Sequence, residues 1–330
     1  MPSLLSSPPP RVLSPRFLKY HCGIDLDELA VRVFPNVQKH YKMFDLAKFG
    51  ASKWRHIDNP QGLLRVAQTR LLGNYFSKIE FPPFLFGSIP KRNALQNAEV
   101  HEGAPALVHL DIAHCFPSID NYRIFGVFRR LLGCSEEISS ALTRLTTIDG
   151  RLPQGAPTSP ALANLALLPL TTRLWKLAEA NKCRFSCYVD DLHFSGETAP
   201  QLADRAIRMV EEEGFSVSIE KIEVVRQDKP MQVTGYRTNR TARASRATID
   251  SVAFQIHDLA RKEAISPGQL RSVIARIHGI RTTHPNQAAC LLRMADWHLP
   301  PTSESAATKA SSKFRKCPGF ATPHSIAARP

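Results

Sequence analysis

The sequence contains no apolar run that approaches the roughly 20 residues a membrane-spanning helix needs. Its first 16 residues are rich in Pro and Ser and lack the apolar core of a secretory signal peptide. The seven cysteines are odd in number, scattered and without a C-x-x-C pair, so they indicate neither a disulfide framework nor a zinc site. These absences favour a cytoplasmic protein that does not enter a membrane.

The net charge is strongly positive. Lys and Arg number 43 against 29 Asp and Glu, which gives +14 over 330 residues. Such an excess usually meets a polyanion, because phosphates attract cations and release their own counterions on binding. An anionic membrane surface would explain the charge equally well, so composition alone leaves both partners open.

Both ends of the chain differ in composition from its middle. Residues 1–16 are Pro-rich, and residues 300–330 are rich in Ser, Ala, Pro, Lys and Arg, so we expect a disordered N-terminal segment and a basic disordered tail. Between them, periodicity and turn residues predict a mixture of strands and helices. The predicted strands are 106–112, 184–189, 192–195, 216–219 and 231–236, and the predicted helices are 63–79, 121–132, one from 159 onward with a kink at Pro169, 200–213, and a basic helical region after 249.

Three aspartates stand at the ends of predicted strands. Asp190 and Asp191 lie at the tip of a predicted β-hairpin, and Asp111 comes near the end of a buried strand. If these strands pair, the carboxylates meet at one edge of a sheet and offer the oxygen ligands that Mg²⁺ prefers. Taken alone, Asp190-Asp191 is equally well explained as a plain turn, since Asp favours turns. Against that, like charges and an unpaired carboxylate beside apolar strands are costly, and a metal ion would remove the cost.

A loop rich in turn residues separates the two acidic positions. It spans residues 152–160, contains Gln154 and Gly155, and ends on Ser159-Pro160, which is typical of a helix start. Gly155 would let another backbone or a base pair approach closely. By itself the loop is more simply an ordinary lead into a helix.

Together these segments resemble the motifs of reverse transcriptases. Asp111 followed by Phe116, then the Gln-Gly-x-x-x-Ser-Pro block at 154–160, then the Tyr-x-Asp-Asp box at 188–191, stand in that family's order and spacing. Each piece is short, but the combination is specific, and the resemblance covers residues 31 to 297 approximately.

Within that family the sequence is most similar to bacterial retron reverse transcriptases. Asn97 and His101 fit the Asn-Ala-x-x-His element that precedes the first catalytic strand. Val233, Thr234 and Gly235 match the Val-Thr-Gly triplet that follows the later strands. The resemblance implies contacts with the cognate RNA at these five residues. The alternatives are a strand that ends at a glycine turn for the triplet and a packing role for the histidine.

The resemblance also implies catalytic roles. Asp111, Asp190 and Asp191 would bind two Mg²⁺ ions, helped by the carbonyl of Ile112. Lys221 matches a lysine that protonates the leaving pyrophosphate, a general-acid role. A solvated lysine at a strand end is an equal alternative for that position.

The nucleotide pocket follows from the same resemblance. Phe116 matches the bulky residue that excludes a ribose 2′-hydroxyl, with core packing as the alternative. Gln154 and Gly155 would line the site of the incoming dNTP, and basic residues such as Lys53 and Arg70 would touch its triphosphate or the template.

Three positions depart from the usual pattern of retron enzymes. His114 and Cys115 stand where an acidic or polar residue and then an aromatic are common, and Val189 stands where alanine is commoner. A metal-ligand role for His114 is less plausible than a surface or packing role. None of the three is an expected metal ligand, so the departures bear on nucleotide affinity and fidelity rather than on the chemistry.

The implied fold is α+β, a right-hand polymerase fold with fingers, an antiparallel-sheet palm and a helical thumb. The fingers would span 17–105, the palm 106–248 with a finger insertion at about 121–160, and the thumb 249–299. The basic helices of the thumb would contact the backbone of the template–primer duplex.

The implied function is that of a retron's RNA-directed DNA polymerase. It would copy a cognate structured noncoding RNA into branched, RNA-linked single-stranded DNA, in anti-phage defence. Its partners would be that RNA and its DNA product, dNTPs, an effector protein encoded nearby and a host RNase H, with no membrane. The alternatives are a group II intron-like or abortive-infection reverse transcriptase, a non-catalytic RNA-binding scaffold on a degenerate palm, or binding of the basic tail to a membrane surface.

Overall fold

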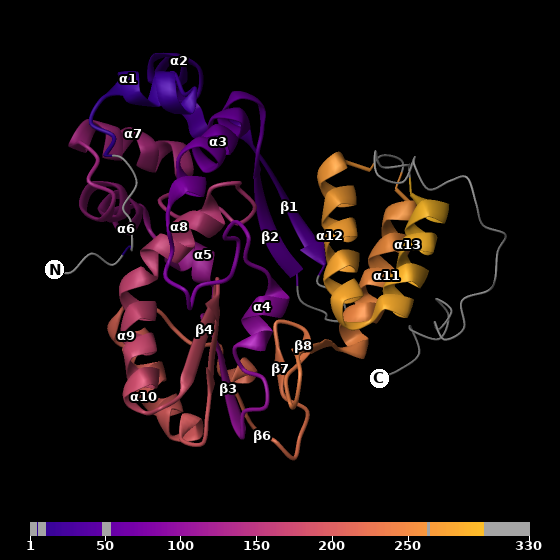
Figure 1. The fold of residues 1–330 in the computed structure, drawn as a ribbon. Coiled ribbons are helices and arrows are strands. Elements are labelled where there is room, and N and C mark those ends of the chain that lie inside the picture. The colour runs from indigo at the N-terminus through magenta and orange to yellow at the C-terminus, as the bar shows by residue number, and fades with distance from the viewer. Residues whose placement is uncertain (1–4, 6–10, 48–53, 263–264, 300–330) are drawn as a thin grey trace.

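A four-stranded antiparallel sheet in the order β4-β5-β3-β6 lies at the centre of the computed structural model, which describes Leu5 and residues 11–47, 54–262 and 265–299 (Figure 1). The strands are β1 (Tyr41–Ala47), β2 (Trp54–Pro60), β3 (Ala106–Asp111), β4 (Arg184–Tyr188), β5 (Asp191–Ser195), β6 (Glu223–Arg226), β7 (Gln232–Val233), β8 (Tyr236–Arg237) and β9 (Arg243–Ala244). The helices are α1 (Pro15–Phe17), α2 (Leu26–Arg32), α3 (Gly62–Asn74), α4 (Ala94–Glu99), α5 (Cys115–Ser118), α6 (Asn121–Gly126), α7 (Glu136–Thr146), α8 (Ser159–Ala166), α9 (Leu168–Ala180), α10 (Ala199–Glu212), α11 (Arg246–Ala260), α12 (Pro267–Thr283) and α13 (Pro285–His298).

The two faces of the central sheet carry different chemistry, because successive side chains of a strand point to opposite sides. Val108 and Leu110 belong to the main hydrophobic core, on the face that α9 and α10 cover. His109 and His193 are register partners on the other face, where His193 also contacts His101, just after α4. One face is therefore apolar and the other carries a row of polar rings.

The main core extends from the sheet to helices α3, α6, α7 and α8. It also takes in part of the N-terminal segment. Leu5 and Val12 are buried, and the Val12 carbonyl accepts a hydrogen bond of 3.1 Å from the amide of Ser135. The prediction of disorder for residues 1–16 is therefore wrong for the described ones, because two apolar side chains reach the core. The predicted tail at 300–330 lies outside the described residues.

Two predicted helices are confirmed with interruptions. The helix predicted at 121–132 consists of α6 and a π-helical turn at Val127–Leu131, and Gly133 with φ +68° follows it. The helix predicted from 159 onward breaks at Leu167, and Pro169 stands in the first turn of α9. Proline has no amide hydrogen to donate and is tolerated at a helix start, so it begins a second helix instead of kinking one.

A second, smaller core joins the sheet β7-β8-β9 to the bundle α11–α13. The bundle confirms the predicted basic helical region. The single strand predicted at 231–236 is wrong, because Thr234 and Gly235 have positive φ and turn the chain into a hairpin. The strand predicted at 216–219 is also wrong. That segment makes one bridge, between Ile112 and Val217, and then a 3₁₀ turn at Ile219–Lys221.

β6, which no sequence signal predicted, is an edge strand with mostly exposed side chains, so it lacks the alternation that marks a half-buried strand.

Across the described ranges, no helix combines the length and apolar character needed to cross a membrane.

Candidate active site

Asp111 and Asp191 lie directly opposite each other on neighbouring strands. They are Cα partners in the register of β3 with β5. The carbonyl of Asp190 accepts a hydrogen bond of 3.0 Å from the amide of Ile112, which ties the tip of the β4–β5 hairpin to the end of β3. The strands therefore pair as predicted, and their pairing brings the three aspartates to one end of the sheet.

The turn that presents Asp190 is supported by the segment that precedes α4. The amide of Phe86 donates a hydrogen bond of 2.8 Å to the carbonyl of Cys187. A Cβ atom added at Gly87 would lie 2.4 Å from Cγ2 and 2.6 Å from the backbone nitrogen of Val189. Val189 has φ +62°, a conformation that strains a β-branched residue. Glycine at position 87 is thus what lets this segment pack against the acidic turn.

Two of the aspartates contact other polar side chains. Lys221 Nζ lies 2.6 Å from Asp111 Oδ2, and Ser218 Oγ donates a hydrogen bond of 2.8 Å to Asp111 Oδ1. His109 Nε2 lies 2.9 Å from Asp191 Oδ1. The sequence left two roles open for Lys221, a general acid or a solvated lysine. In the structure its side chain contacts the carboxylate cluster.

The charge of Asp190 is the least compensated of the three. Its pKa is raised to about 6, first by burial and then by the nearby charges of Asp191 and Asp111, with Lys221 acting in the opposite direction. A cation that comes close would favour the ionised form of this carboxyl group and lower its pKa.

The donor set suits a hard divalent cation, since three carboxylates supply the oxygen ligands that Mg²⁺ prefers. Among the described residues, no three acidic, His or Cys side chains already converge on one point as a metal site. Asp111 is turned toward Lys221, and Asp191 toward His109. The raised pKa of Asp190 is the observation that favours a fit, because a bound cation would supply the missing positive charge.

The residues after β3 surround this cluster. Ile112 and Cys115 are both buried. The pKa of the Cys115 thiol is raised, mainly by its burial and then by the nearby charges of Asp190 and Asp111. Phe116 on α5 is partly buried and packs against the main core, which leaves part of its ring accessible. His114 is exposed and has φ +49°.

Gly155 packs closely against β2. It has φ +119°, and a Cβ atom there would lie 2.8 Å from Cγ2 of Ile57. Two hydrogen bonds join the backbone of Gln154 to Asp58. The amide of Asp58 donates one of 2.8 Å to the carbonyl of Gln154, and the amide of Gln154 donates one of 3.2 Å to Asp58 Oδ2. The amide of the Gln154 side chain lies between the carbonyl of His56 and Nε of Arg55. The partner that approaches Gly155 in this structure is therefore a strand.

An ion pair between a buried aspartate and a partly exposed arginine, which the sequence analysis missed, holds this loop. Asp58 is fully buried, and its two oxygens lie 2.8 and 3.3 Å from the guanidinium nitrogens of Arg151. Hydrogen bonding to Asp58 raises the pKa of Arg151. The two residues are 93 positions apart, so no local pattern reveals the pair.

The two short elements that resemble retron motifs meet in space. Asn97 Nδ2 donates a hydrogen bond of 3.4 Å to Thr234 Oγ1 across 137 positions of sequence. Thr234 and Gly235 form the β7–β8 turn, and the Gly235 carbonyl accepts a hydrogen bond of 2.7 Å from Thr248 Oγ1. Asn97 and Val233 are buried, so the accessible part of this assembly is the turn itself.

A row of three imidazoles leads from α4 to the carboxylates. His101 is fully buried and lies 2.7 Å from the hydroxyls of both Ser186 and Ser195. Its ring centroid lies 5.8 Å from that of His193, which stacks on His109 at 4.8 Å. His109 in turn contacts Asp191, as described above. Because its ring is enclosed by protein, His101 can influence an RNA only by positioning its neighbours.

Of the two basic residues expected near the triphosphate, Arg70 has no contact with the carboxylates among those the structure gives for the described residues. Arg70 on α3 donates a hydrogen bond of 2.7 Å to the carbonyl of Gly23. Lys53 lies outside the described residues.

Comparisons with known proteins find one family and several relatives with similar sequences. A family described as reverse transcriptase (RNA-dependent DNA polymerase) matches residues 40–238. The chain is 32% identical over 278 residues to the retron Mx65 reverse transcriptase of Myxococcus xanthus, covering 77% of this chain and 64% of that protein. It is 31% identical over 280 residues to the retron Mx162 reverse transcriptase of the same organism, covering 72% and 57%. The retron Ec86 reverse transcriptase of Escherichia coli is 32% identical over 199 residues, covering 59% and 62%. The chain thus spans between 57% and 64% of the length of these relatives.

Proposed function

Because this chain belongs to the reverse transcriptase (RNA-dependent DNA polymerase) family, as a retron-type member, we propose that it is an RNA-directed DNA polymerase whose active site is built on Asp111, Asp190 and Asp191. The observation that carries the proposal is the pairing of Asp111 with Asp191 across β3 and β5, with Asp190 at the hairpin tip. All three residues lie within the matched range 40–238.

The reaction is the attack of a primer hydroxyl on the α-phosphate of a dNTP. Two Mg²⁺ ions held by the three aspartates, with the carbonyl of Ile112, would neutralise charge on the attacking and leaving oxygens. The protein's own part is to fix the carboxylates on paired strands, so that little reorganisation is needed during the reaction. Lys221, whose Nζ lies 2.6 Å from Asp111 Oδ2, would transfer a proton to the leaving pyrophosphate.

Nucleotide selection would use residues on two sides of the carboxylates. The accessible part of the Phe116 ring would exclude a ribose 2′-hydroxyl. Gln154 and Gly155, fixed on β2 by Asp58, would line the site of the incoming dNTP. Val189 and Cys115 lie beside the aspartates, so they bear on nucleotide affinity and fidelity rather than on metal binding.

The right-hand architecture is proposed on the same grounds. The central sheet with α9 and α10 would be the palm at 106–248, with the finger insertion at about 121–160. Residues 17–105 would form the fingers, and the bundle α11–α13 would be the thumb at 249–299. Arg271, Arg276 and Arg281 on α12 would contact phosphates of the template–primer duplex, which position it without reading its sequence.

The template would be a structured noncoding RNA made with the protein, as the resemblance to retron enzymes implies. DNA synthesis would give a branched, RNA-linked single-stranded product, with RNA removal by a host RNase H and a nearby effector protein in anti-phage defence. The accessible Thr234-Gly235 turn would contact this RNA, and the buried Asn97 and His101 would hold that turn and the adjoining strands in place.

Substitution of the acidic turn tests the proposed activity. We expect the double variant Asp190→Asn, Asp191→Asn to lose Mg²⁺-dependent dNTP incorporation on a primed RNA while it keeps most of its RNA affinity. Asp27→Asn, which removes one exposed carboxylate on α2, serves as the control and should incorporate normally. If the wild-type protein incorporates no dNTP on any primed RNA, it is a non-catalytic RNA-binding scaffold and the proposal fails.

Sequencing of the nucleic acid that copurifies with the protein tests the retron assignment. A single defined RNA with attached DNA is the expected result. Random or untemplated DNA would instead indicate an abortive-infection type of enzyme, and intron RNA would indicate a group II intron-like one.

A further inference from the structure

A groove lies between α9 and α10, two helices that pack against the central sheet (Figure 1). Val108 and Leu110 point toward these helices into the main core. Asp111 and His109 alternate with them along β3 and therefore point to the other face. The groove has a volume of about 520 Å³ and is separate from the proposed active site.

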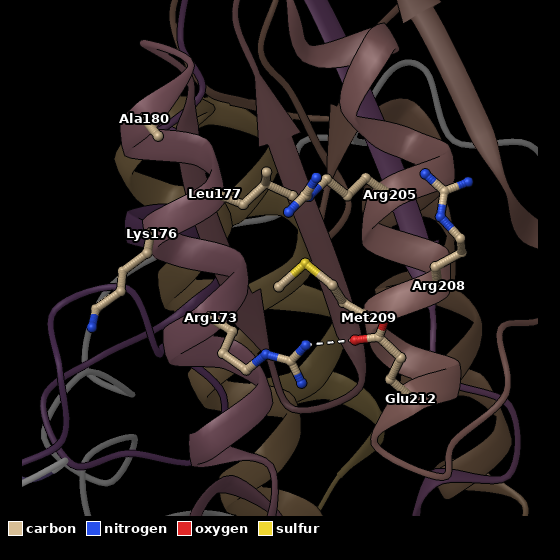
Figure 2. A pocket seen from close by; sticks show the side chains of 8 residues that line it. All are labelled: Arg173, Lys176, Leu177, Ala180, Arg205, Arg208, Met209 and Glu212. Atoms are coloured by element: carbon tan, nitrogen blue, oxygen red, sulfur yellow. Dashed lines mark hydrogen bonds and ion pairs between the residues drawn. The ribbon is translucent and has the colours of Figure 1, made fainter. Parts of the chain in front are cut away.

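Each wall of the groove carries two cations at helical spacing. Arg173 and Lys176 lie three residues apart on α9, and Arg205 and Arg208 lie three apart on α10. All four are exposed. Figure 2 shows Arg205 extending from α10 toward Leu177 on α9, with Lys176 and Arg208 on the two outer sides.

Most of this positive charge has no counter-charge. Glu212 is the acidic residue that lines the groove. Arg173 forms ion pairs with Glu212, at 2.6 Å between Nη2 and Oε2, and with Glu213, at 3.2 Å between Nη1 and Oε2. Within the part of the chain that the structure describes, Lys176, Arg205 and Arg208 form no ion pair. Arg205 points into the groove and Lys176 and Arg208 flank it, so an anion that lies along the groove would meet positive charge from both helices.

We propose that this groove binds the phosphodiester backbone of single-stranded nucleic acid. Arg donors match phosphate oxygens in bidentate geometry, and lysine adds a point charge. The groove volume of about 520 Å³ is too small for a duplex, so nucleic acid would lie along it as a single strand. Leu177 and Met209 provide an apolar lining against which sugars or bases can rest.

The occupant is a segment of the RNA that the enzyme copies, beyond the stretch at the carboxylates. This part of the inference rests on the proposed function, which places a long polyanion on the other face of the same sheet. An acidic protein segment could also meet four cations, but the net charge of +14 and the family to which the chain belongs favour nucleic acid. The groove would thus be a second nucleic-acid site that holds flanking template.

The salt dependence of RNA binding tests the inference. The probe is a labelled oligouridylate of about 30 nucleotides, titrated by fluorescence anisotropy at several salt concentrations. In the triple variant Lys176→Gln, Arg205→Gln, Arg208→Gln, the slope of log affinity against log salt should become shallower by about 2, because each phosphate contact on a single strand contributes about 0.7. The matched variant Lys176→Arg, Arg205→Lys, Arg208→Lys keeps the charges and should retain most of the wild-type slope.

Lysine footprinting gives a readout on the wild-type chain that does not depend on any variant folding. Acetylation of Lys176, measured by mass spectrometry, should fall severalfold when the oligouridylate is present. An unchanged slope in the glutamine variant, with Lys176 equally reactive with and without RNA, overturns the inference and leaves the groove to an acidic protein segment.

Activity separates this inference from the proposed function. The glutamine variant should incorporate dNTPs on a saturating short primed RNA as the wild type does, because its substitutions lie on the far side of the sheet. Absence of incorporation by the wild type would defeat the proposed function and would leave the salt slope and the footprint as independent tests of the groove.

Discussion

Gly87 is the position where one added methyl group tests how the acidic turn is held. The Cβ of Gly87→Ala would lie 2.4 Å from Cγ2 of Val189 and 2.6 Å from its backbone nitrogen, whereas ordinary van der Waals contact begins at 3.4 Å. The second contact is with backbone, so no side-chain rotation relieves it. Either the segment before α4 or the turn that carries Asp190 must move by about 1 Å, the difference between these distances and ordinary contact.

Two magnitudes follow from that displacement. Overpacking of a buried site typically lowers the free energy of unfolding by about 1–3 kcal/mol. A shift of about 1 Å in a reacting group typically slows a reaction by about a hundredfold. We therefore expect Gly87→Ala to be folded, moderately destabilised, and slower in dNTP incorporation by about tenfold to a hundredfold at a temperature well below its melting point.

The assay is single-turnover dNTP incorporation on a primed RNA, together with chemical denaturation of each variant. Gly73→Ala on α3 is the matched control, since nothing lies within 4 Å of its new Cβ. Its free energy of unfolding should rise by about 0.4–1 kcal/mol, with unchanged incorporation. Adding Val189→Ala to Gly87→Ala removes the contact with Cγ2 only, so it should restore part of the activity. Wild-type incorporation by Gly87→Ala would refute the idea that this contact fixes the turn.

Three further substitutions probe groups that surround the site. Arg151→Ala removes the guanidinium from buried Asp58, which keeps the Gln154 amide and His56 as neighbours, and should lower the free energy of unfolding by about 3 kcal/mol in a denaturant titration, with Arg151→Lys intermediate. Burial lowers the pKa of His101 to about 3 from its ordinary 6.5, so the folded state binds fewer protons and stability falls as the pH drops below about 6.5, by about 1.4 kcal/mol per pH unit. His101→Gln should make this dependence shallower by about one proton, and an unchanged slope would show that another group titrates. His109→Leu removes the contact with Asp191 and should lower incorporation by about tenfold to a hundredfold, while His109→Gln should retain more activity; equal activity in both would exclude a positioning role.

The acidic constellation could be predicted because its residues obey strong local rules. An apolar run predicts a buried strand, and two aspartates between apolar strands predict a hairpin tip, so β3, β4 and β5 were placed to within a residue or so. The prediction that the carboxylates lie together required these strands to pair. They do pair, with Asp111 opposite Asp191.

The groups that hold the site could not be predicted in the same way, because their partners are remote in sequence. The side chain of Asp58 meets Arg151 across 93 positions, and Gly87 meets the turn at Val189 from a loop with no regular pattern. β6 is an exposed edge strand whose place depends on pairing with β3 and not on its own composition. Long-range contacts of this kind appear only when the chain is folded.

A short motif records that a residue type is needed at a position, but it does not say whether a ligand or the fold needs it. Asn97 and Thr234 belong to separate motifs that the resemblance assigns to RNA, and in the structure they bond each other. Gly235 permits a positive φ beside Thr248, a requirement of the turn whether or not RNA is present. The burial of a side chain distinguishes a residue that the fold needs from one that can contact a ligand. A side chain with no accessible surface, such as His101, acts on a ligand only through its neighbours, whereas the partly exposed turn at Thr234 is where a direct contact is possible.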